Sequence, residues 1–361
     1  MRHIIIGAGP GGVVAAETLR KNNPSDQIIL IGNEAAPPYS RMAIPYLLVD
    51  DIEESGTFLR AKGHYKNLGI EYILGHVASI DTDKKVCMLA DGGQLSYDSL
   101  CIASGSTPIS PPIEGIDLPK VHSCWTLEDA RKISALATPD SDVVLMGAGF
   151  IGCIILESLV KRKVNLSVIE MGSRMVPRML DENAGGLLKQ WCINDGVNVH
   201  TGTKVNAIKQ TADGMQVELD NGESIKADLV ISATGVKSNT SFLDGSGLDI
   251  DYGILVDNKM QTNIPNIYAV GDVAQGMDFS TGEYTVQAIQ PTATDHGRIA
   301  GLNMAGKYAV HNGSLNMNIL DTLGLISTSY GLWMGVEGGD SAEIYTPDLF
   351  KYMNLRFGVG D

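Results

Sequence analysis

The chain has 361 residues, of which 44% are hydrophobic and 19% charged, and its formal net charge is −15 at pH 7. This length and composition suit two or three domains with proper cores, and no apolar run approaches the length of a membrane span. The acidic balance, with no basic run to offset it, argues against nucleic acid or an anionic membrane as a partner.

The first element is an apolar strand predicted over residues 3–6, which runs straight into a glycine pattern. Gly7, Gly9 and Gly12 have the spacing Gly-x-Gly-x-x-Gly and open a helical stretch. Such glycines permit a tight turn and let a pyrophosphate approach the backbone, while the helix N-terminus offers unpaired N–H groups. In this context the pattern predicts a dinucleotide-binding unit.

A second strand is predicted over residues 27–31, and the residue that ends such a strand usually contacts the ribose. That position is Gly32 here, so we assign the ribose contact to Glu34. A shifted register or a contact through water is the alternative.

A later apolar strand, residues 100–104, breaks at Ser104 and Gly105. Such a break lets the chain pass close beneath a bound nucleotide before it crosses between domains. Residues 108–115 are proline-rich and predict a stiff connection to a second domain.

The second domain repeats the pattern of the first. The strand predicted over residues 143–146 leads into Gly147, Gly149 and Gly152, and residues 229–235 form another strand that breaks at Gly235. Two such units predict two bound dinucleotides.

The strand predicted over residues 165–169 is followed by Glu170. A carboxylate there accepts hydrogen bonds from both ribose hydroxyls and repels a 2′-phosphate, which favours NAD over NADP. Arg174 lies four residues on and could soften that preference.

A third segment ends an apolar strand in Gly271 and Asp272. The glycine allows close approach, and the aspartate is placed to accept hydrogen bonds from a polyol such as a ribityl chain. A helix is predicted over residues 290–303, and Pro291 in its first turn is a start signal. The free N–H groups of that turn, near Ala293, would stabilise negative charge on a reduced flavin.

These motifs, in this order, resemble the FAD-dependent pyridine nucleotide-disulfide oxidoreductase superfamily, near the branch of rubredoxin reductases, ferredoxin reductases and nitrite reductase flavin domains. The resemblance implies an α/β fold with two Rossmann-like dinucleotide-binding domains and a shortened C-terminal α+β interface domain. The expected domains are 1–108 plus 241–312 for FAD, 109–240 for NAD(P)H, and 313–361 at the C-terminus.

The resemblance also implies which residues bind which cofactor. The expected FAD contacts are Gly7, Gly9, Gly12, Glu34, Arg41, Ser104, Gly105, Gly271, Asp272 and Ala293. The expected contacts of NADH, preferred over NADPH, are Gly147, Gly149, Gly152, Glu170 and Gly235. Hydride would pass from the nicotinamide to the flavin, and the protein's task is to hold the two rings at contact distance.

Thiol chemistry is not expected. Family members that relay electrons through a single cysteine carry it at the position of Met42, and a thioether cannot form a thiolate or a mixed disulfide. The reduced flavin would therefore deliver electrons directly. Arg41 resembles the family arginine beside the flavin, and the alternative is that it only pairs with a surface carboxylate.

Two replacements distinguish the chain from ferredoxin-reductase-like members, which carry a lysine at the position of Tyr46 and a glutamate at that of Ile154. In those relatives the two residues align as a charged pair beside the flavin and nicotinamide. Losing only one of the two residues would leave the other as a buried charge without a partner, so the loss of both is the physically consistent outcome. We expect a neutral wall at the nicotinamide site; the alternative is that Ile154 is a core residue facing the sheet.

Three functions are consistent with the sequence. The first is an NADH:acceptor reductase that serves a small redox protein, such as rubredoxin or ferredoxin, or a reductase partner. The second is an NADH oxidase or diaphorase that reduces oxygen or quinones, and the third is a redox-sensing flavoprotein that acts by partner binding.

The remaining expectations concern cellular location, metal binding and oligomeric state. The first strand starts within three residues, which leaves no room for a signal peptide, and the five cysteines are odd in number and scattered, so we expect a cytoplasmic protein. The sequence shows no pattern for zinc, iron–sulfur or haem. A homodimer is possible, because the C-terminal domain of the family often supplies the subunit interface.

Overall fold

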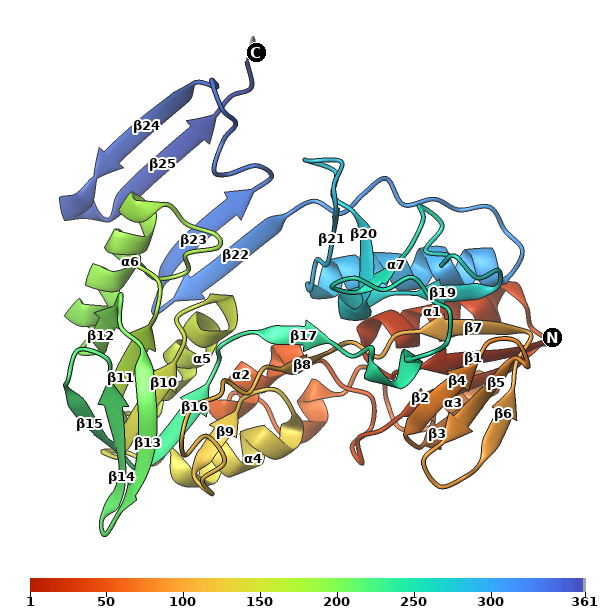
Figure 1. Cartoon of the computed structure of the whole chain (residues 1–361), viewed down its shortest axis with the longest axis horizontal. Coiled ribbons are helices and arrows are strands. Elements are labelled where there is room, and N and C mark those ends of the chain that lie inside the picture. The colour runs from red at the N-terminus through yellow and green to blue at the C-terminus, as the bar shows by residue number, and fades with distance from the viewer. Residues whose placement is uncertain (360–361) are drawn as a thin grey trace. The chain divides into compact units, whose positions relative to one another are not determined.

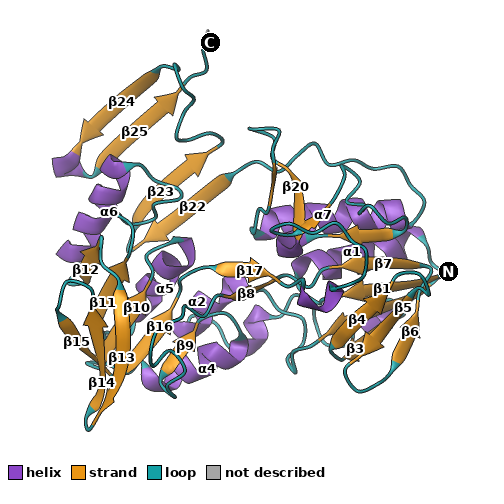
Figure 2. Ribbon diagram, in the orientation of Figure 1, coloured by secondary structure: helices purple, strands orange, loops and turns teal. Residues whose placement is uncertain are grey.

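The computed structural model describes residues 1–359 and divides the chain into two compact units (Figures 1 and 2). The first unit comprises residues 1–42, 54–107 and 237–315, and the second comprises 43–53, 108–236 and 316–361, whose last two residues lie outside the described part. Each unit is built on one five-stranded parallel sheet.

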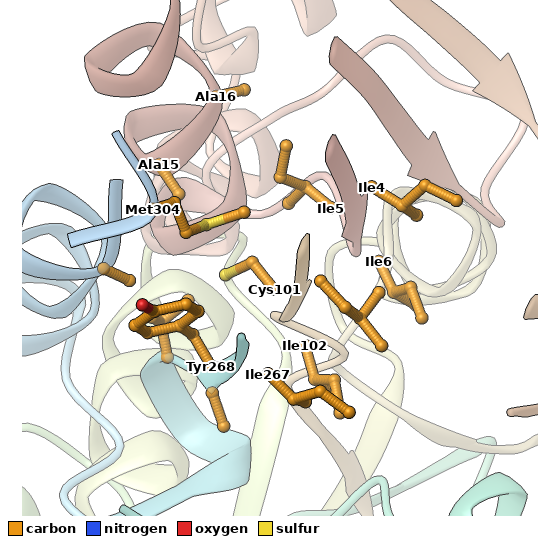
Figure 3. Close-up of a cluster of buried hydrophobic side chains, with 14 of the residues drawn as sticks. Ile4, Ile5, Ile6, Ala15, Ala16, Cys101, Ile102, Ile267, Tyr268 and Met304 are labelled. Atoms are coloured by element: carbon orange, nitrogen blue, oxygen red, sulfur yellow. The ribbon is translucent and has the colours of Figure 1, made fainter. Parts of the chain in front are cut away.

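The sheet of the first unit is covered by helices and therefore carries continuous apolar strands. Its strands, in spatial order, are β19 (Ile267–Ala269), β7 (Ser99–Ile102), β1 (Arg2–Ile6), β2 (Gln27–Gly32) and β3 (Ile70–Leu74). Its helices are α1 (Pro10–Asn22), α3 (His64–Asn67) and α7 (Gln290–Met304). Figure 3 shows this core, where Ile5 of β1, Cys101 of β7 and Met304 of α7 lie close together.

Glycines bring α1 and α7 unusually close. A Cβ atom on Gly297 would lie 2.2 Å from the carbonyl oxygen of Gly11, and one on Gly301 would lie 2.8 Å from that of Ala15. The middle of α7 is thereby held against the first half of α1.

Two smaller sheets complete the first unit. One is antiparallel and contains β4 (Val77–Asp81), β5 (Val86–Leu89) and β6 (Gln94–Ser96); the other contains β18 (Ile254–Leu255), β20 (Ala274–Met277) and β21 (Tyr284–Thr285). Two crossover strands, β8 (Ser106–Pro108) and β17 (Val236–Ser238), pair with each other where the chain passes between the units.

The second unit repeats the plan of the first. Its parallel strands, in spatial order, are β12 (Asn198–Thr201), β11 (Asn165–Glu170), β10 (Asp142–Met146), β16 (Leu229–Ser232) and β9 (Val121–Ser123). An antiparallel sheet contains β13 (Val205–Thr211), β14 (Gly214–Leu219) and β15 (Ser224–Ala227), and the helices are α2 (Ile44–Leu48), α4 (Leu127–Leu136), α5 (Phe150–Lys161) and α6 (Glu182–Asn194).

Residues 43–53, which the sequence analysis grouped with the first domain, cluster with the second unit. The reason is that α2 packs along α5. The Ser158 hydroxyl donates to the carbonyl oxygen of Pro45 at 3.1 Å, and Arg162, which caps α5, donates to that of Leu48 at 2.6 Å.

The C-terminal segment also clusters with the second unit and forms two antiparallel hairpins. They are β22 (Met317–Thr322) with β23 (Leu325–Tyr330), and β24 (Ser341–Thr346) with β25 (Lys351–Arg356). One face of the second hairpin reaches α6, because Tyr352 donates to Asp181 at 2.5 Å, while Ile344 and Met353 on the other face are 56% and 47% exposed.

Candidate functional site: two dinucleotide cradles

The first glycine loop joins β1 to α1. Gly7 has a φ of +109°, which L side chains rarely adopt, and its N–H donates to the carbonyl oxygen of Ile31 at 2.8 Å. A Cβ atom on Gly7 would lie 2.0 Å from the carbonyl oxygen of Ala103, and one on Gly12 would lie 2.0 Å from that of Gly7. These two positions therefore require glycine.

The second loop, between β10 and α5, has the same geometry. Gly147 has a φ of +98°, and its N–H donates to the carbonyl oxygen of Ile169 at 2.7 Å. A Cβ atom on Gly147 would lie 2.5 Å from the carbonyl oxygen of Ala233, and one on Gly152 would lie 2.1 Å from that of Gly147.

The middle glycine of each loop is different, because it faces open space. A Cβ atom on Gly9 or Gly149 would meet nothing within 4 Å among the described residues. Both glycines are helix N-caps, and within residues 1–359 neither helix start has a capping side chain. Open space in front of uncapped N–H groups fits a pyrophosphate in each unit.

Glu170 ends β11 beside the second loop and is only 9% exposed. Its carboxylate accepts hydrogen bonds from the N–H groups of Ala148, at 2.7 Å, and of Gly172, at 2.6 Å. The side chain is thus fixed by the loop it supports, and its remaining lone pairs are available to a ribose.

Arg174, which could have received a 2′-phosphate, is already engaged. Its guanidinium donates to the carbonyl oxygens of Leu180, at 2.7 Å, and Pro177, at 3.3 Å, and to the carboxylate of Glu182 at 2.6 Å. These contacts hold the cation to the protein's own loop.

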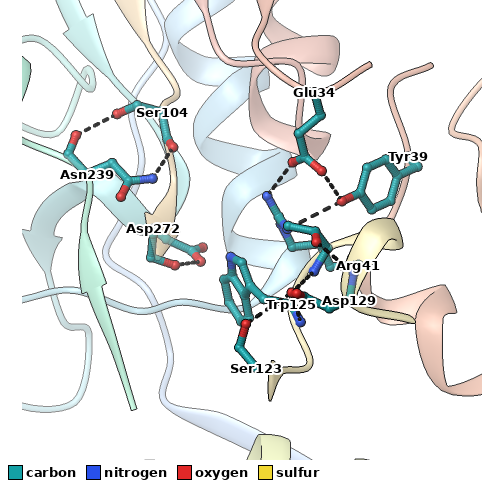
Figure 4. A network of polar contacts seen from close by, with 11 residues as sticks. Glu34, Tyr39, Arg41, Ser104, Ser123, Trp125, Asp129, Asn239 and Asp272 are labelled. Carbon is teal, nitrogen blue, oxygen red and sulfur yellow. Dashed lines mark hydrogen bonds and ion pairs between the residues drawn. The ribbon is translucent and has the colours of Figure 1, made fainter. Parts of the chain in front are cut away.

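In the first unit, the position matching Glu170 is Gly32, and a Cβ atom there would lie 2.5 Å from the Tyr72 hydroxyl. Glu34 lies beyond this crowded point and pairs with Arg41, whose guanidinium donates to it at 2.8 Å (Figure 4). Tyr39 donates to the same carboxylate at 2.5 Å. The two predicted FAD contacts, Glu34 and Arg41, therefore lie together.

Asp272 follows Gly271 after β19, and its side chain is largely withdrawn from water. Burial raises the pKa of this carboxyl above its usual value, while a hydrogen bond from Ser106 and the charge of Arg41 oppose the rise. The Ser106 hydroxyl donates at 2.8 Å. Sequence reasoning did not assign Ser106 a role, although it stands directly after Gly105 at the strand break.

Ser104 and Asn239 hold the two crossover strands together, as Figure 4 shows. The Ser104 hydroxyl donates to the carbonyl oxygen of Asn239 at 2.9 Å, and the Asn239 amide donates to that of Ser104 at 2.8 Å. In the second unit the corresponding break at Gly235 has a φ of +120°.

The first turn of α7 lies against the Gly271 segment, because a Cβ atom on Gly271 would be 3.3 Å from that of Ala293. Further along the helix, His296 is 3% exposed, and burial lowers its pKa to about 4. Its Nε2 lies 3.3 Å from the Ser314 hydroxyl, and its ring contacts that of His311 edge to face.

Tyr46 and Ile154 both belong to the second unit, on α2 and α5 respectively. Tyr46 follows Pro45, which receives the Ser158 hydrogen bond, and Ile154 lies one helical turn before Ser158. Tyr46 is 58% exposed and Ile154 is partly buried, whereas Leu156 on the same helix is fully buried.

The cysteines are buried and free, and burial raises the pKa of all five thiols. In the described part of the chain, no group of three or more His, Cys, Asp or Glu side chains could hold a metal ion. Within residues 1–359, none of the helices combines the length and the apolar character needed to cross a membrane.

Comparison with known proteins gives consistent matches. The family model described as pyridine nucleotide-disulphide oxidoreductase matches residues 1–297. The NADH-dependent phenylglyoxylate dehydrogenase subunit epsilon of Aromatoleum evansii is 31% identical over 99% of this chain and 86% of that protein. The NADH oxidase of Methanocaldococcus jannaschii is 35% identical over 85% of this chain and 70% of that protein. A NAD-dependent persulfide reductase from A. fulgidus superposes with a TM-score of 0.89 at 29% identity, over 95% of this chain and 67% of that one.

Proposed function

The chain belongs to the pyridine nucleotide-disulphide oxidoreductase family, and on that premise we propose that it passes electrons from NADH, through FAD, directly to a protein acceptor. The family uses FAD and a pyridine nucleotide, and the protein is an NAD(P)H-dependent oxidoreductase. The observation that carries the proposal is the pair of matching cradles, each with one open glycine, at Gly9 and Gly149.

FAD is assigned to the first unit. When bound, it supplies a ring that accepts two electrons as a hydride from the nicotinamide and passes them on. The chain's part is to hold it: the loop at Gly9 binds the pyrophosphate, Glu34 the ribose, and Asp272 the ribityl chain. Ser106 would orient the Asp272 carboxylate for that contact.

NADH is assigned to the second unit, and Glu170 is the reason for preferring it. The carboxylate is fixed by two backbone N–H groups at the end of β11. The negative charge of a 2′-phosphate bound there would be repelled by this carboxylate. Arg174 would have to leave Glu182 and two carbonyl oxygens before it could offset that repulsion.

Electrons would pass from the flavin to the acceptor directly, without a cysteine thiol as an intermediate carrier. The position of the family's single redox cysteine is held by Met42, which is 47% exposed. The five cysteines present are buried thiols with raised pKa values, which makes thiolate formation unfavourable.

Tyr46 and Ile154 would form a neutral wall on the nicotinamide side of the second unit. The test is to replace them with Lys and Glu, singly and together. Each single replacement should slow flavin reduction by NADH more than the double, because a lone charge has no partner. If flavin reduction in the single variants is no slower than in the double variant, the proposed pairing of the two positions is wrong.

The acceptor is proposed to be a small redox protein or a reductase subunit, because ferredoxin and rubredoxin reductases are among the relatives and one relative is itself a subunit. The net charge of −15 means that an acidic acceptor would need a local basic patch to dock. An NADH oxidase is the second candidate, favoured by the 35% identical relative of that name.

The deciding experiment is anaerobic stopped-flow absorbance with NADH or NADPH, followed by readmission of oxygen. Rapid bleaching by NADH with slow reoxidation supports a protein acceptor. Rapid reoxidation supports the oxidase instead, and absence of bleaching would reject both.

Two further parts of the proposal concern setting and assembly. Five free cysteines suit a reducing cytoplasm. A homodimer would cover the exposed apolar faces of the C-terminal hairpins, where Ile326, Ile344 and Met353 are 67%, 56% and 47% exposed.

A further inference from the structure

One tertiary hydrogen bond joins two segments that are 250 residues apart in the sequence. The Ser40 hydroxyl donates to the amide oxygen of Gln290 at 2.6 Å, and both side chains are partly buried. Ser40 precedes the short 3₁₀ turn Arg41–Ala43, and Gln290 is the first residue of α7. Both residues lie in the first unit.

The bond holds the end of the Gln290 side chain against Ser40. Because the hydroxyl occupies the amide oxygen, the Nε2 group is turned away from Ser40 and keeps two N–H donors for another partner. A glutamine without such a contact could adopt other rotamers and place its amide elsewhere.

The surroundings of Gln290 are those of the predicted flavin site. Ala293, one turn further along α7, packs against Gly271, and Asp272 follows directly. Arg41, next to Ser40, is close enough to Asp272 for its charge to lower the pKa of that carboxyl. Ser40 and Gln290 therefore lie at the same edge of the unit as the residues assigned to the ribityl chain.

We propose that Gln290 donates a hydrogen bond to the flavin ring and that Ser40 is the positioning residue that holds its side chain in place. The inference rests on the proposed binding of FAD in the first unit. Flavin carbonyl oxygens accept such a bond, and the bond strengthens when the ring gains negative charge on reduction. The pair would thus favour the reduced form, together with the free N–H groups at the start of α7.

The test compares wild type with Gln290→Leu, Gln290→Glu, Ser40→Ala and the Ser40→Ala/Gln290→Leu double variant. Gln190→Leu, on the exposed face of α6, is the matched control. Two quantities are measured: the FAD affinity of the apoprotein, by quenching of flavin fluorescence, and the midpoint potential of bound FAD, by anaerobic dye titration. Neither depends on turnover.

Gln290→Leu should make the midpoint potential more negative and weaken FAD binding about twofold to tenfold, the range for one net hydrogen bond. Ser40→Ala should act in the same direction but less strongly, and the double variant should match Gln290→Leu. Gln290→Glu keeps the shape of the side chain, and its charge should lower the potential further. Gln190→Leu should change neither quantity.

An unchanged potential in both Gln290 variants would overturn the inference, and so would additive effects of Ser40→Ala and Gln290→Leu. Failure of wild type to bind FAD would overturn the proposed function itself. If wild type binds FAD and NADH bleaches it, but the Gln290 variants have the same midpoint potential as wild type, this inference alone is overturned.

Discussion

Glu170 has a structural role in the second glycine loop, and we propose that it also sets the choice of cofactor. The carboxylate accepts hydrogen bonds from the N–H groups of Ala148 and Gly172, and it ends β11 at the position proposed for the ribose contact. A residue with both tasks is recognisable from sequence, because it ends a strand directly after a glycine fingerprint. Asp272 is comparable, but its partner Ser106 emerges only from the structure.

Replacing Glu170 with Gln should reduce both the stability of the loop and the preference for NADH. Charged hydrogen bonds contribute about 1.5–3 kcal/mol each, so kcat/KM for NADH should fall at least about tenfold. The value for NADPH should fall less, because the repulsion of a 2′-phosphate is also removed. Flavin reduction kinetics with both nucleotides check this, with Glu128→Gln on α4 as the control; an unchanged NADH:NADPH ratio would show that Glu170 does not discriminate.

His296 should make the first unit less stable in mild acid. Its pKa in the folded chain is about 4, against 6.5 for a free histidine. Between pH 6.5 and 4 the unfolded chain binds a proton that the folded chain does not, so stability falls as pH falls, by up to about 3 kcal/mol.

The measurement for His296 is thermal release of FAD at pH 7 and pH 5, followed by flavin fluorescence. His296→Gln should lose less stability than wild type over this interval. His200→Gln, on β12 of the second unit, should behave like wild type. Equal losses in the His296 variant and wild type would rule out this histidine as the cause.

At the scale of elements, the repeated unit of strand, glycine loop and helix is set locally. Apolar runs predict the strands, and the glycine spacing predicts where each chain segment turns; the helix expected over 290–303 is confirmed as Gln290–Met304. How closely the helices approach is decided between elements, and the contact of α1 with α7 depends on Gly297 and Gly11.

Gly297→Ala should push α7 away from the first glycine loop. Its new Cβ would lie 2.2 Å from the carbonyl oxygen of Gly11, and overpacking of this kind costs about 1–3 kcal/mol. FAD affinity should fall with stability.

The matched control is Gly186→Ala on α6, where an added Cβ meets nothing within 4 Å among the described residues. It should be neutral or stabilising by up to about 1 kcal/mol, since alanine is the better helix former. Urea unfolding and FAD titration check both variants, and equal stability of the two would contradict the close contact.

At the scale of the whole molecule, exposed apolar residues are concentrated at the C-terminal end. The hairpins of the segment 316–359 contribute Ile319, Ile326, Tyr330, Ile344, Met353 and Leu355 to the exposed large hydrophobic residues. Two-stranded sheets are marginal alone. The second hairpin is attached to α6 through polar contacts of Tyr352 and Asn354 with Asp181 and through an edge-to-face contact of Phe350 with Trp191. Such faces are expected to be covered in an assembly.

Ile344→Lys with Met353→Lys should disrupt the proposed homodimer. The two residues are directly opposite on the exposed face, so the added charges would be buried in any interface that covers it. Sedimentation analysis should show a dimer for wild type and a monomer for the variant, while Gln210→Lys with Gln216→Lys on β13 and β14 should remain dimeric. A variant that still dimerises would place the interface elsewhere.

Several features follow from the sequence by itself because they depend on short-range patterns. The two glycine loops, the strands that lead into them, the carboxylate at Glu170 and the family are all visible in runs of adjacent residues. Turns and strand periods depend on neighbours within a few positions, so they are legible without a structure.

The tertiary structure decided the contacts that join distant segments. It paired Ser40 with Gln290 and Ser106 with Asp272, and it grouped residues 43–53 with the second unit. No local pattern encodes these contacts, because each depends on where two separately formed elements meet after the sheets and helices have packed.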